Sequence, residues 1–201
     1  MLIFHKQKLV LLSVPKTGTT SLQTALESKA DIVVKDPPGL KHLSFRGYQR
    51  LFEPMLKKHC EGPFETVAVI REPIDWMASW YKYRSRPFLN NSPNSTKSID
   101  FDTFIRAYLS DDVPAYAKIG SQSNFAAAKD GSPGVTHRFR YESMDEICAF
   151  LRARLSLDFE LPVLNKSPAR ELSLSSDVET LFRETNSKDF DLWENAKTKS
   201  V

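Results

Sequence analysis

Short apolar runs alternate with helix-like segments along most of the chain. Apolar runs cover residues 8–14, 31–34 and 66–70, and residues 135–141 alternate between polar and apolar. Runs of this length are typical of strands, and continuous apolar runs indicate strands buried on both faces of a parallel sheet. Apolar residues recur at helical spacing between and after these runs, over 22–26, 47–59, 74–83, 101–109, 147–151 and 175–185. Strands that alternate with helices predict a three-layer α/β fold with a mostly parallel central sheet.

The chain has 201 residues, a length that suits one domain. We expect a single domain over 1–201, with an irregular loop over 87–98 and a weakly ordered tail near 195–201. Residues 87–98 are rich in Pro, Asn and Ser, which favours a loop. Ser143 and Glu146 have the spacing of a capping box, which predicts that a helix begins there.

The turn between the first predicted strand and the first predicted helix carries the clearest chemical signal. Residues 14–21 read VPKTGTTS. A glycine-containing turn that leads into a helix directs backbone N–H groups and the positive end of the helix dipole at one point. Lys16 adds a full positive charge, and the hydroxyl groups add donors. This segment predicts a site for phosphate or sulfate; the alternative interpretation is a threonine-rich helix cap beside an exposed lysine.

The segment differs from a Walker A loop, in which the lysine follows the second glycine and precedes a magnesium-binding Ser or Thr. Here Lys16 precedes the glycine of the turn, Gly18. No strand-borne aspartate that would bind Mg²⁺ is evident. We therefore expect no metal and disfavour nucleotide hydrolysis.

A second candidate site follows the strand predicted over 66–70. Arg71 lies at its carboxyl end, where open α/β sheets bind ligands, and Ser79 follows eight residues later, about two helical turns on. Arginine suits a phosphate because its planar guanidinium donates two parallel hydrogen bonds. The alternative is a surface pair between Arg71 and Glu72, with a serine chosen for its small size.

These two segments together resemble the sulfotransferases that use 3′-phosphoadenosine 5′-phosphosulfate (PAPS). The sequence PKTGTTS resembles that family's 5′-phosphosulfate loop, and Arg71 with Ser79 resembles its 3′-phosphate motif. The resemblance spans roughly residues 8 to 170 and is concentrated in these two motifs. It implies a P-loop-like fold in which the 5′-phosphosulfate is held by Lys16, Thr17, Gly18, Thr19, Thr20 and Ser21.

Two further segments resemble the family less closely. Residues 139–144, FRYESM, are similar to a Tyr-Glu-Asp-Leu/Met segment whose tyrosine contacts the adenine, which implies that role for Tyr141. Ser143 departs from the pattern, and a strand-end tyrosine is also common in a core. Residues 164–167, LNKS, resemble a late loop whose basic residues close over the 3′-phosphate. Lys166 is the first candidate there and Arg170 the next; a solvated charged loop is the alternative.

An acceptor hydroxyl must lose a proton, and histidine is suited to take it. Of the four histidines, His42 alone follows a predicted strand through a Pro-Pro-Gly loop. The segment KHLSF, residues 41–45, is similar to the stretch in which some family members carry a catalytic histidine. Other members use a glutamate, so Glu72 and Glu142 remain alternatives to His42.

The sequence therefore predicts a PAPS-dependent sulfotransferase that moves a sulfuryl group to a hydroxyl or amine by in-line displacement, with Lys16 and His42 as catalytic residues. Two alternatives are a non-catalytic nucleotide-binding module and a degenerate P-loop kinase. The acceptor, a small molecule or a carbohydrate, is not specified, because specificity lies in loops.

Composition limits the partners and the cellular location that we expect for this protein. The net charge of +3 comes without a dense basic stripe, so we expect no nucleic-acid partner. No apolar run reaches the roughly 18 residues of a membrane span. The apolar N-terminal segment lacks the basic start and cleavage site of a signal peptide. We expect a cytoplasmic protein in which Cys60 and Cys148 are free thiols.

Overall fold

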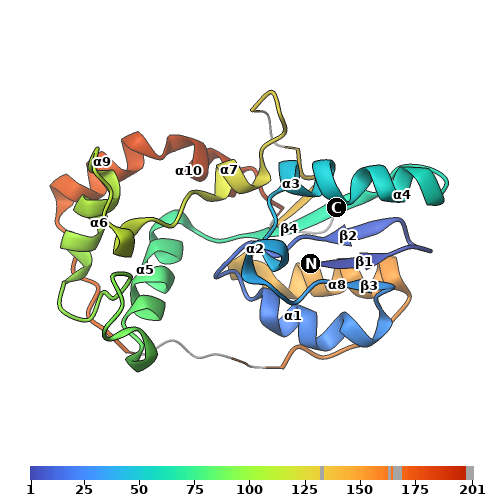
Figure 1. Cartoon of the computed structure of the whole chain (residues 1–201), viewed down its shortest axis with the longest axis horizontal. Coiled ribbons are helices and arrows are strands. Elements are labelled where there is room, and N and C mark those ends of the chain that lie inside the picture. The colour runs from blue at the N-terminus through green and yellow to red at the C-terminus, as the bar shows by residue number, and fades with distance from the viewer. Residues whose placement is uncertain (132–133, 163, 165–168, 198–201) are drawn as a thin grey trace.

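The computed structural model describes residues 1–131, 134–162, 164 and 169–197. In this part of the chain, helices cover both faces of a five-stranded sheet, as the three-layer α/β prediction required (Figure 1). The strands lie in the order β3-β1-β2-β4-β5. Their bounds are β1 Leu2–Phe4, β2 Leu9–Leu11, β3 Ile32–Val33, β4 Glu65–Ile70 and β5 His137–Arg140.

The sheet is mixed, but its direction is parallel apart from β1. β2 pairs parallel with β4, and β4 pairs parallel with β5. β1 is antiparallel to both of its neighbours, β2 and β3. β3 therefore runs in the same direction as β2, β4 and β5, and the carboxyl ends of these strands meet at one edge of the sheet.

Successive side chains of the strands point alternately into two hydrophobic cores, one on each face of the sheet. In β4, Val67 and Val69 belong to the core under α1 (Thr19–Leu26) and α8 (Met144–Leu155). The neighbouring Ala68 and Ile70 face the core under α3 (Phe45–Leu51) and α4 (Glu53–His59). Because successive side chains of a strand point to opposite faces, a run of buried residues builds both layers at once. Figure 1 shows the two pairs of helices on opposite sides of the sheet.

A group of helices extends beyond the carboxyl edge of the sheet (Figure 1). Its helices are α5 Pro73–Arg84, α6 Phe101–Leu109, α7 Gln122–Ala126, α9 Ser176–Thr185 and α10 Ser187–Glu194. Tyr81 of α5 packs against Phe101 and Phe104 of α6, with ring centroids 5.4 and 5.7 Å away. This third core fixes α5, whose first turn follows β4 directly.

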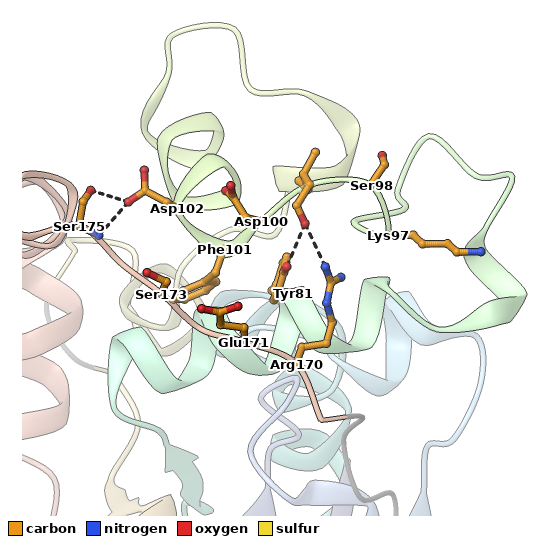
Figure 2. A pocket seen from close by; sticks show the side chains of 11 residues that line it. Tyr81, Lys97, Ser98, Asp100, Phe101, Asp102, Arg170, Glu171, Ser173 and Ser175 are labelled. Atoms are coloured by element: carbon orange, nitrogen blue, oxygen red, sulfur yellow. Dashed lines mark hydrogen bonds between the residues drawn. The ribbon is translucent and has the colours of Figure 1, made fainter.

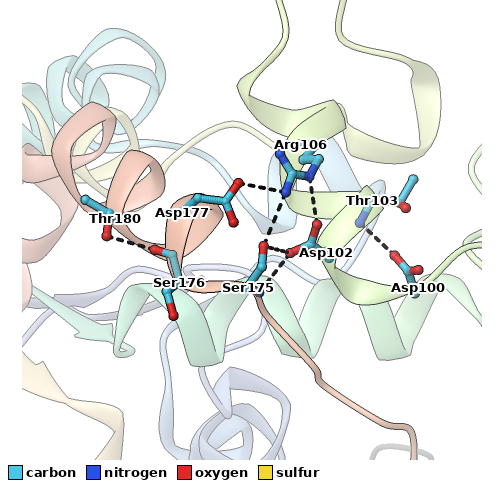
Figure 3. A network of polar contacts seen from close by, with 8 residues as sticks. All are labelled: Asp100, Asp102, Thr103, Arg106, Ser175, Ser176, Asp177 and Thr180. Carbon is cyan, nitrogen blue, oxygen red and sulfur yellow. Dashed lines mark hydrogen bonds and ion pairs between the residues drawn. The ribbon is translucent and has the colours of Figure 1, made fainter.

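A polar network joins α6 to α9 at the surface of this group (Figure 3). Asp102 accepts hydrogen bonds from the backbone N–H of Ser175, at 2.9 Å, and from its hydroxyl. Arg106 donates to Asp102 at 2.7 Å and to Asp177 at 2.9 Å. These bonds hold the pKa of Asp102 at about 2, with the Ser175 hydroxyl as the largest cause.

Most predicted elements are confirmed, with corrections where local chemistry was misread. The single helix predicted over 47–59 is wrong: α3 ends at Leu51, and α4 begins at Glu53 with Pro54 in its first turn. The helix start predicted at Ser143 is confirmed, since α8 begins at Met144, but the capping box is wrong, because the Ser143 side chain makes no capping hydrogen bond. The prediction omitted β1, α7, α10 and the short helix α2 Pro38–Lys41. No helix of the described residues has the length and apolar character needed to cross a membrane.

Candidate active site

A cavity of about 430 Å³ lies at the carboxyl edge of the sheet. Pro15, Arg71 and Tyr141 line it, and they follow β2, β4 and β5 respectively. Its wall includes these residues proposed from the sequence: Lys16, Gly18, Thr19, Thr20, Ser21, His42, Arg71, Ser79 and Tyr141. Thr17 lies behind this wall and is fully buried, and Lys166 lies outside the described residues.

The loop between β2 and α1 is held in a shape that leaves its amide groups available. The Thr17 hydroxyl donates to the Val14 carbonyl at 2.9 Å, and the Trp76 indole donates to the Pro15 carbonyl at 2.7 Å. Lys16 and Gly18 both have left-handed backbone, with φ of 66° and 73°. Among the described residues, the N–H groups of residues 17–20 have no acceptor. These free donors at the start of α1 suit an anion.

The Lys16 ammonium lies against aromatic rings on α5. Its Nζ is 4.1 Å from the ring centroid of Tyr83 and 5.9 Å from that of Trp80. Burial, which is the largest cause, and the nearby charges of Arg86 and Arg71 together lower the pKa of Lys16 to about 8. Neither an aromatic face nor a neighbouring cation neutralises this charge, so an anion placed here would be strongly attracted.

Arg71 is fixed through its backbone and its side chain. The Gln122 side chain accepts from the Arg71 N–H at 2.9 Å and donates to the Arg71 carbonyl at 2.7 Å. The guanidinium stacks on Tyr141, 4.4 Å from the ring centroid, and donates to the Lys16 carbonyl at 3.3 Å. Its Nε is buried without a hydrogen-bond partner among the described residues. Such an unpaired buried donor is costly unless a ligand or solvent satisfies it.

Tyr141 and Ser79 complete the wall near Arg71. Tyr141 packs on Gly18 so closely that a Cβ added to that glycine would lie 3.1 Å from the Tyr141 ring. Positive φ and this close approach together explain why glycine occupies position 18. Ser79 lies two turns along α5 from Arg71 and is buried in the wall of the same cavity.

His42 has a defined tautomer. It caps the carboxyl end of α2, and its Nδ1 lies 2.8 Å from the Ser13 carbonyl oxygen. A carbonyl only accepts, so Nδ1 carries the proton and the neutral ring has its lone pair on Nε2. Burial is the largest cause that lowers the pKa of His42. The hydrogen bond with Ser13 raises this pKa, and the charges of Lys41 and Lys16 lower it.

The two glutamates considered as alternative bases are occupied elsewhere. Glu72 caps α5 by accepting from the Asp75 N–H at 2.7 Å, and burial raises its pKa. Glu142 accepts from the Glu72 N–H at 2.9 Å and from the Trp193 indole at 3.0 Å. Neither residue lines the cavity that contains Lys16 and His42. Their geometry indicates that they support the strand ends.

A second cavity, of about 680 Å³, lies on the other side of α5 (Figure 2). Arg170 lines it rather than the Lys16 cavity, and donates to the carbonyls of Thr96 and Ile99, both at 3.0 Å. Tyr81 also donates to the Ile99 carbonyl, at 2.9 Å, and Figure 2 shows Arg170 and Tyr81 side by side in this cavity. Arg170 therefore holds the chain after residue 96 against α5, and two of its five N–H donors are used in doing so.

Several residues of the Lys16 cavity were not selected from the sequence as site residues: Pro38, Lys41, Trp80, Tyr83, Arg86 and Leu164. Trp80 and Tyr83 fall within the helix predicted over 74–83, and their spacing carries no sign of a ligand. Lys41, Arg86, Lys16 and Arg71 give the cavity a strongly positive wall, and its described lining contains no carboxylate. No group of three or more His, Cys, Asp or Glu side chains within the described chain could hold a metal ion.

Comparisons with known proteins gave one structural similarity. No protein-family model matches the chain, and no curated protein matches it. Among solved structures, the chain is similar to the crystal structure of mouse sulfotransferase SULT7A1 complexed with PAP. The TM-score is 0.46 and the sequence identity 18%, and the match covers 100% of this chain and 70% of the mouse chain. PAP is the ligand of the mouse protein in that structure.

Proposed function

We propose that this protein transfers a sulfuryl group from PAPS to a hydroxyl or amine of a small-molecule or carbohydrate acceptor. The observation that carries the proposal is that Lys16, Arg71 and His42 line one cavity at the carboxyl edge of the sheet. A phosphate-type loop, an arginine for a second phosphate and a neutral histidine are the parts that this reaction needs. A cytoplasmic location stays a prediction.

The residues of the cavity fit the charges of the donor. The free N–H groups of residues 17–20 and the Lys16 ammonium suit the 5′-phosphosulfate. Arg71 and Ser79 suit the 3′-phosphate, and the unpaired Nε of Arg71 supplies a donor that nothing in the described chain uses. Tyr141, which stacks on Arg71, offers an aromatic face at the same end of the cavity. The donor supplies the activated sulfuryl group, and the protein supplies position and electrostatics.

In the proposed reaction His42 acts as the base. Its Nε2 lone pair takes the proton of the acceptor hydroxyl while the acceptor oxygen forms a bond to sulfur. The bond between sulfur and the bridging oxygen breaks, and that oxygen keeps the electron pair in the product nucleotide, 3′-phosphoadenosine 5′-phosphate. The Ser13 carbonyl keeps the ring in the tautomer that this step requires, because it holds the other proton on Nδ1.

Lys16 stabilises the negative charge that grows on the leaving oxygen. Its partial burial strengthens this interaction, because the effective dielectric constant is lower than in water. A bound anion also favours the charged form of Lys16 and opposes the effect of burial on its pKa. The Lys16 charge therefore serves donor binding and the chemical step together.

The decisive experiment measures binding and transfer on the same preparation. Calorimetry in EDTA should show binding of 3′-phosphoadenosine 5′-phosphate, with weaker binding of adenosine 5′-phosphate, which lacks the 3′-phosphate. ATP with Mg²⁺ is the comparison for a kinase. Radiolabelled PAPS should then pass its sulfate to at least one compound of an acceptor panel. Binding that requires Mg²⁺, or a preference for ATP, would overturn the proposal.

A further inference from the structure

The cavity contains two cations to which the proposed donor contacts give no role. Lys16 and the loop amides suit the phosphosulfate, and Arg71 with Ser79 suits the 3′-phosphate, which leaves Lys41 and Arg86 on the wall. Neither Lys41 nor Arg86 forms an ion pair with any described residue. Four cations that face one cavity repel one another. Anions that bind in the cavity would reduce the electrostatic cost of this arrangement.

These two cations lie at the end of the cavity where the acceptor must react. Lys41 immediately precedes His42, and its charge acts on the His42 ring together with that of Lys16. Arg86 lies 5.2 Å from the ring centroid of Tyr83, the same ring that Lys16 contacts at 4.1 Å. Arg71 is at the opposite end of α5, one residue before the helix cap. An acceptor hydroxyl placed between His42 and Lys16 therefore has Lys41 on the His42 side and Arg86 on the Lys16 side as additional charges.

The wall between these cations is aromatic and continues into an exposed apolar rim. Trp80 and Tyr83 meet edge to face at 5.9 Å, and Tyr83 meets Phe88 in the same way at 5.9 Å. Phe88 is 66% exposed, and Leu164, which lines the cavity, is 41% exposed. Flat aromatic or aliphatic groups pack well on such a surface, whereas a fully hydroxylated sugar gains less from it.

We propose that the acceptor is a hydroxylated apolar acid: a molecule with a flat or aliphatic body that carries a carboxylate, sulfate or phosphate besides the hydroxyl that reacts. Its body packs on Trp80 and Tyr83, and its anionic group binds Lys41 and Arg86. This inference rests on the proposed function, since it assigns the second substrate of the same site.

Matched acceptors separate this inference from a general preference for phenols or sugars. 4-Hydroxybenzoate and 4-hydroxybenzamide have nearly the same shape and differ in charge, and glucuronate and glucose form the corresponding sugar pair. At saturating PAPS, kcat/KM for 4-hydroxybenzoate should exceed that for the amide at least tenfold, and both sugars should be poorer. Calorimetry with the protein saturated with 3′-phosphoadenosine 5′-phosphate provides a readout that needs no turnover: 4-hydroxybenzoate should bind more tightly than the amide.

Variants test which residues read the charge. Arg86→Gln and Lys41→Gln should each reduce the benzoate-to-benzamide ratio about tenfold, the effect expected for losing one charge-assisted hydrogen bond. Lys82→Gln is the matched control, because Lys82 lies on α5 but does not line the cavity, and its ratio should equal that of the wild type. Equal ratios in wild type and both variants, or no preference for the charged acceptor, would overturn the inference while sulfuryl transfer still stands. A protein that binds no 3′-phosphoadenosine 5′-phosphate would overturn the proposed function itself.

Discussion

The side chain of Gln122 forms two hydrogen bonds with the backbone of Arg71, one to its N–H and one to its carbonyl. Gln122 is fully buried, and its own N–H donates to Asp189 of α10 at 3.0 Å. The residue assigned to the 3′-phosphate is therefore positioned by helices that come much later in the chain. Sequence motifs identify the arginine, but not what holds it in place.

Replacing Gln122 by alanine should weaken nucleotide binding, although Gln122 has no proposed contact with the nucleotide. The change leaves two backbone groups of Arg71 unpaired in a buried position, and we expect the free energy of unfolding to fall by about 1–3 kcal/mol. The affinity for 3′-phosphoadenosine 5′-phosphate should fall more than that for adenosine 5′-phosphate. Chemical denaturation and calorimetry measure both effects. Ser123→Ala, one residue further along α7, is the control, and a Gln122→Ala protein that selects the 3′-phosphate normally would contradict the prediction.

His42→Ala should lower kcat by roughly 10²–10⁴ and leave nucleotide affinity nearly unchanged. The physical reason is that, in the proposed mechanism, His42 removes a proton from the acceptor and has no assigned contact with the donor. His59→Ala serves as the control, because His59 lies at the exposed end of α4. Melting temperature is measured on the same samples. If the folded His42→Ala protein kept a normal kcat, the base would have to be sought elsewhere.

The pH dependence of kcat/KM should be bell-shaped, and both limbs are assigned. His42 must be neutral, and because burial lowers its pKa, the acid limb should lie below the ordinary value of 6.5. Lys16 must be charged, and since its pKa in the free protein is about 8, activity should fall as the pH rises through 8. Lys16→Arg keeps its charge at high pH, so the alkaline limb should move upward in that variant. An alkaline limb that stays in place in Lys16→Arg would exclude Lys16 as its source.

The network around Asp102 should make the helices beyond the sheet sensitive to acid. Hydrogen bonds lower the pKa of Asp102 from 3.8 to about 2. A carboxyl group whose pKa is depressed on folding contributes stability above its unfolded pKa and loses it as pH falls through the folded value. The contribution should therefore be complete above about pH 4 and disappear toward pH 2. Asp102→Asn should flatten this part of the stability curve, whereas Asp158→Asn, at an exposed ion pair, should not.

The sequence predicted the elements whose patterns are local. The helix over 101–109 agrees residue by residue with α6, and the run over 66–70 lies within β4, because apolar periodicity and a cap such as Asp100 act over a few residues. It also selected residues that the fold brings to one cavity, since loops after neighbouring parallel strands meet at one edge.

Features that depend on distant contacts could not be predicted. β1 is three residues long and becomes a strand only by pairing with β2 and β3. The role of Gln122 depends on α7 and α10 packing beside β4, and polar residues in a short loop-like segment give no sign of that. Lys41 and Arg86 are separated by more than forty residues, so only the folded chain reveals that they face one cavity.

The left-handed backbone of Lys16 affects how substitutions at this position are interpreted. A non-glycine residue in this conformation costs about 1–2 kcal/mol, so position 16 stores conformational strain as well as charge. Lys16→Ala removes the ammonium and keeps the strain, whereas Lys16→Gly removes both and frees the unfolded chain. Asparagine tolerates the same φ better than alanine and is uncharged, so Lys16→Asn isolates the electrostatic part most cleanly. The backbone handedness of Lys16 and the anion binding that we propose for its side chain are therefore separate constraints on position 16.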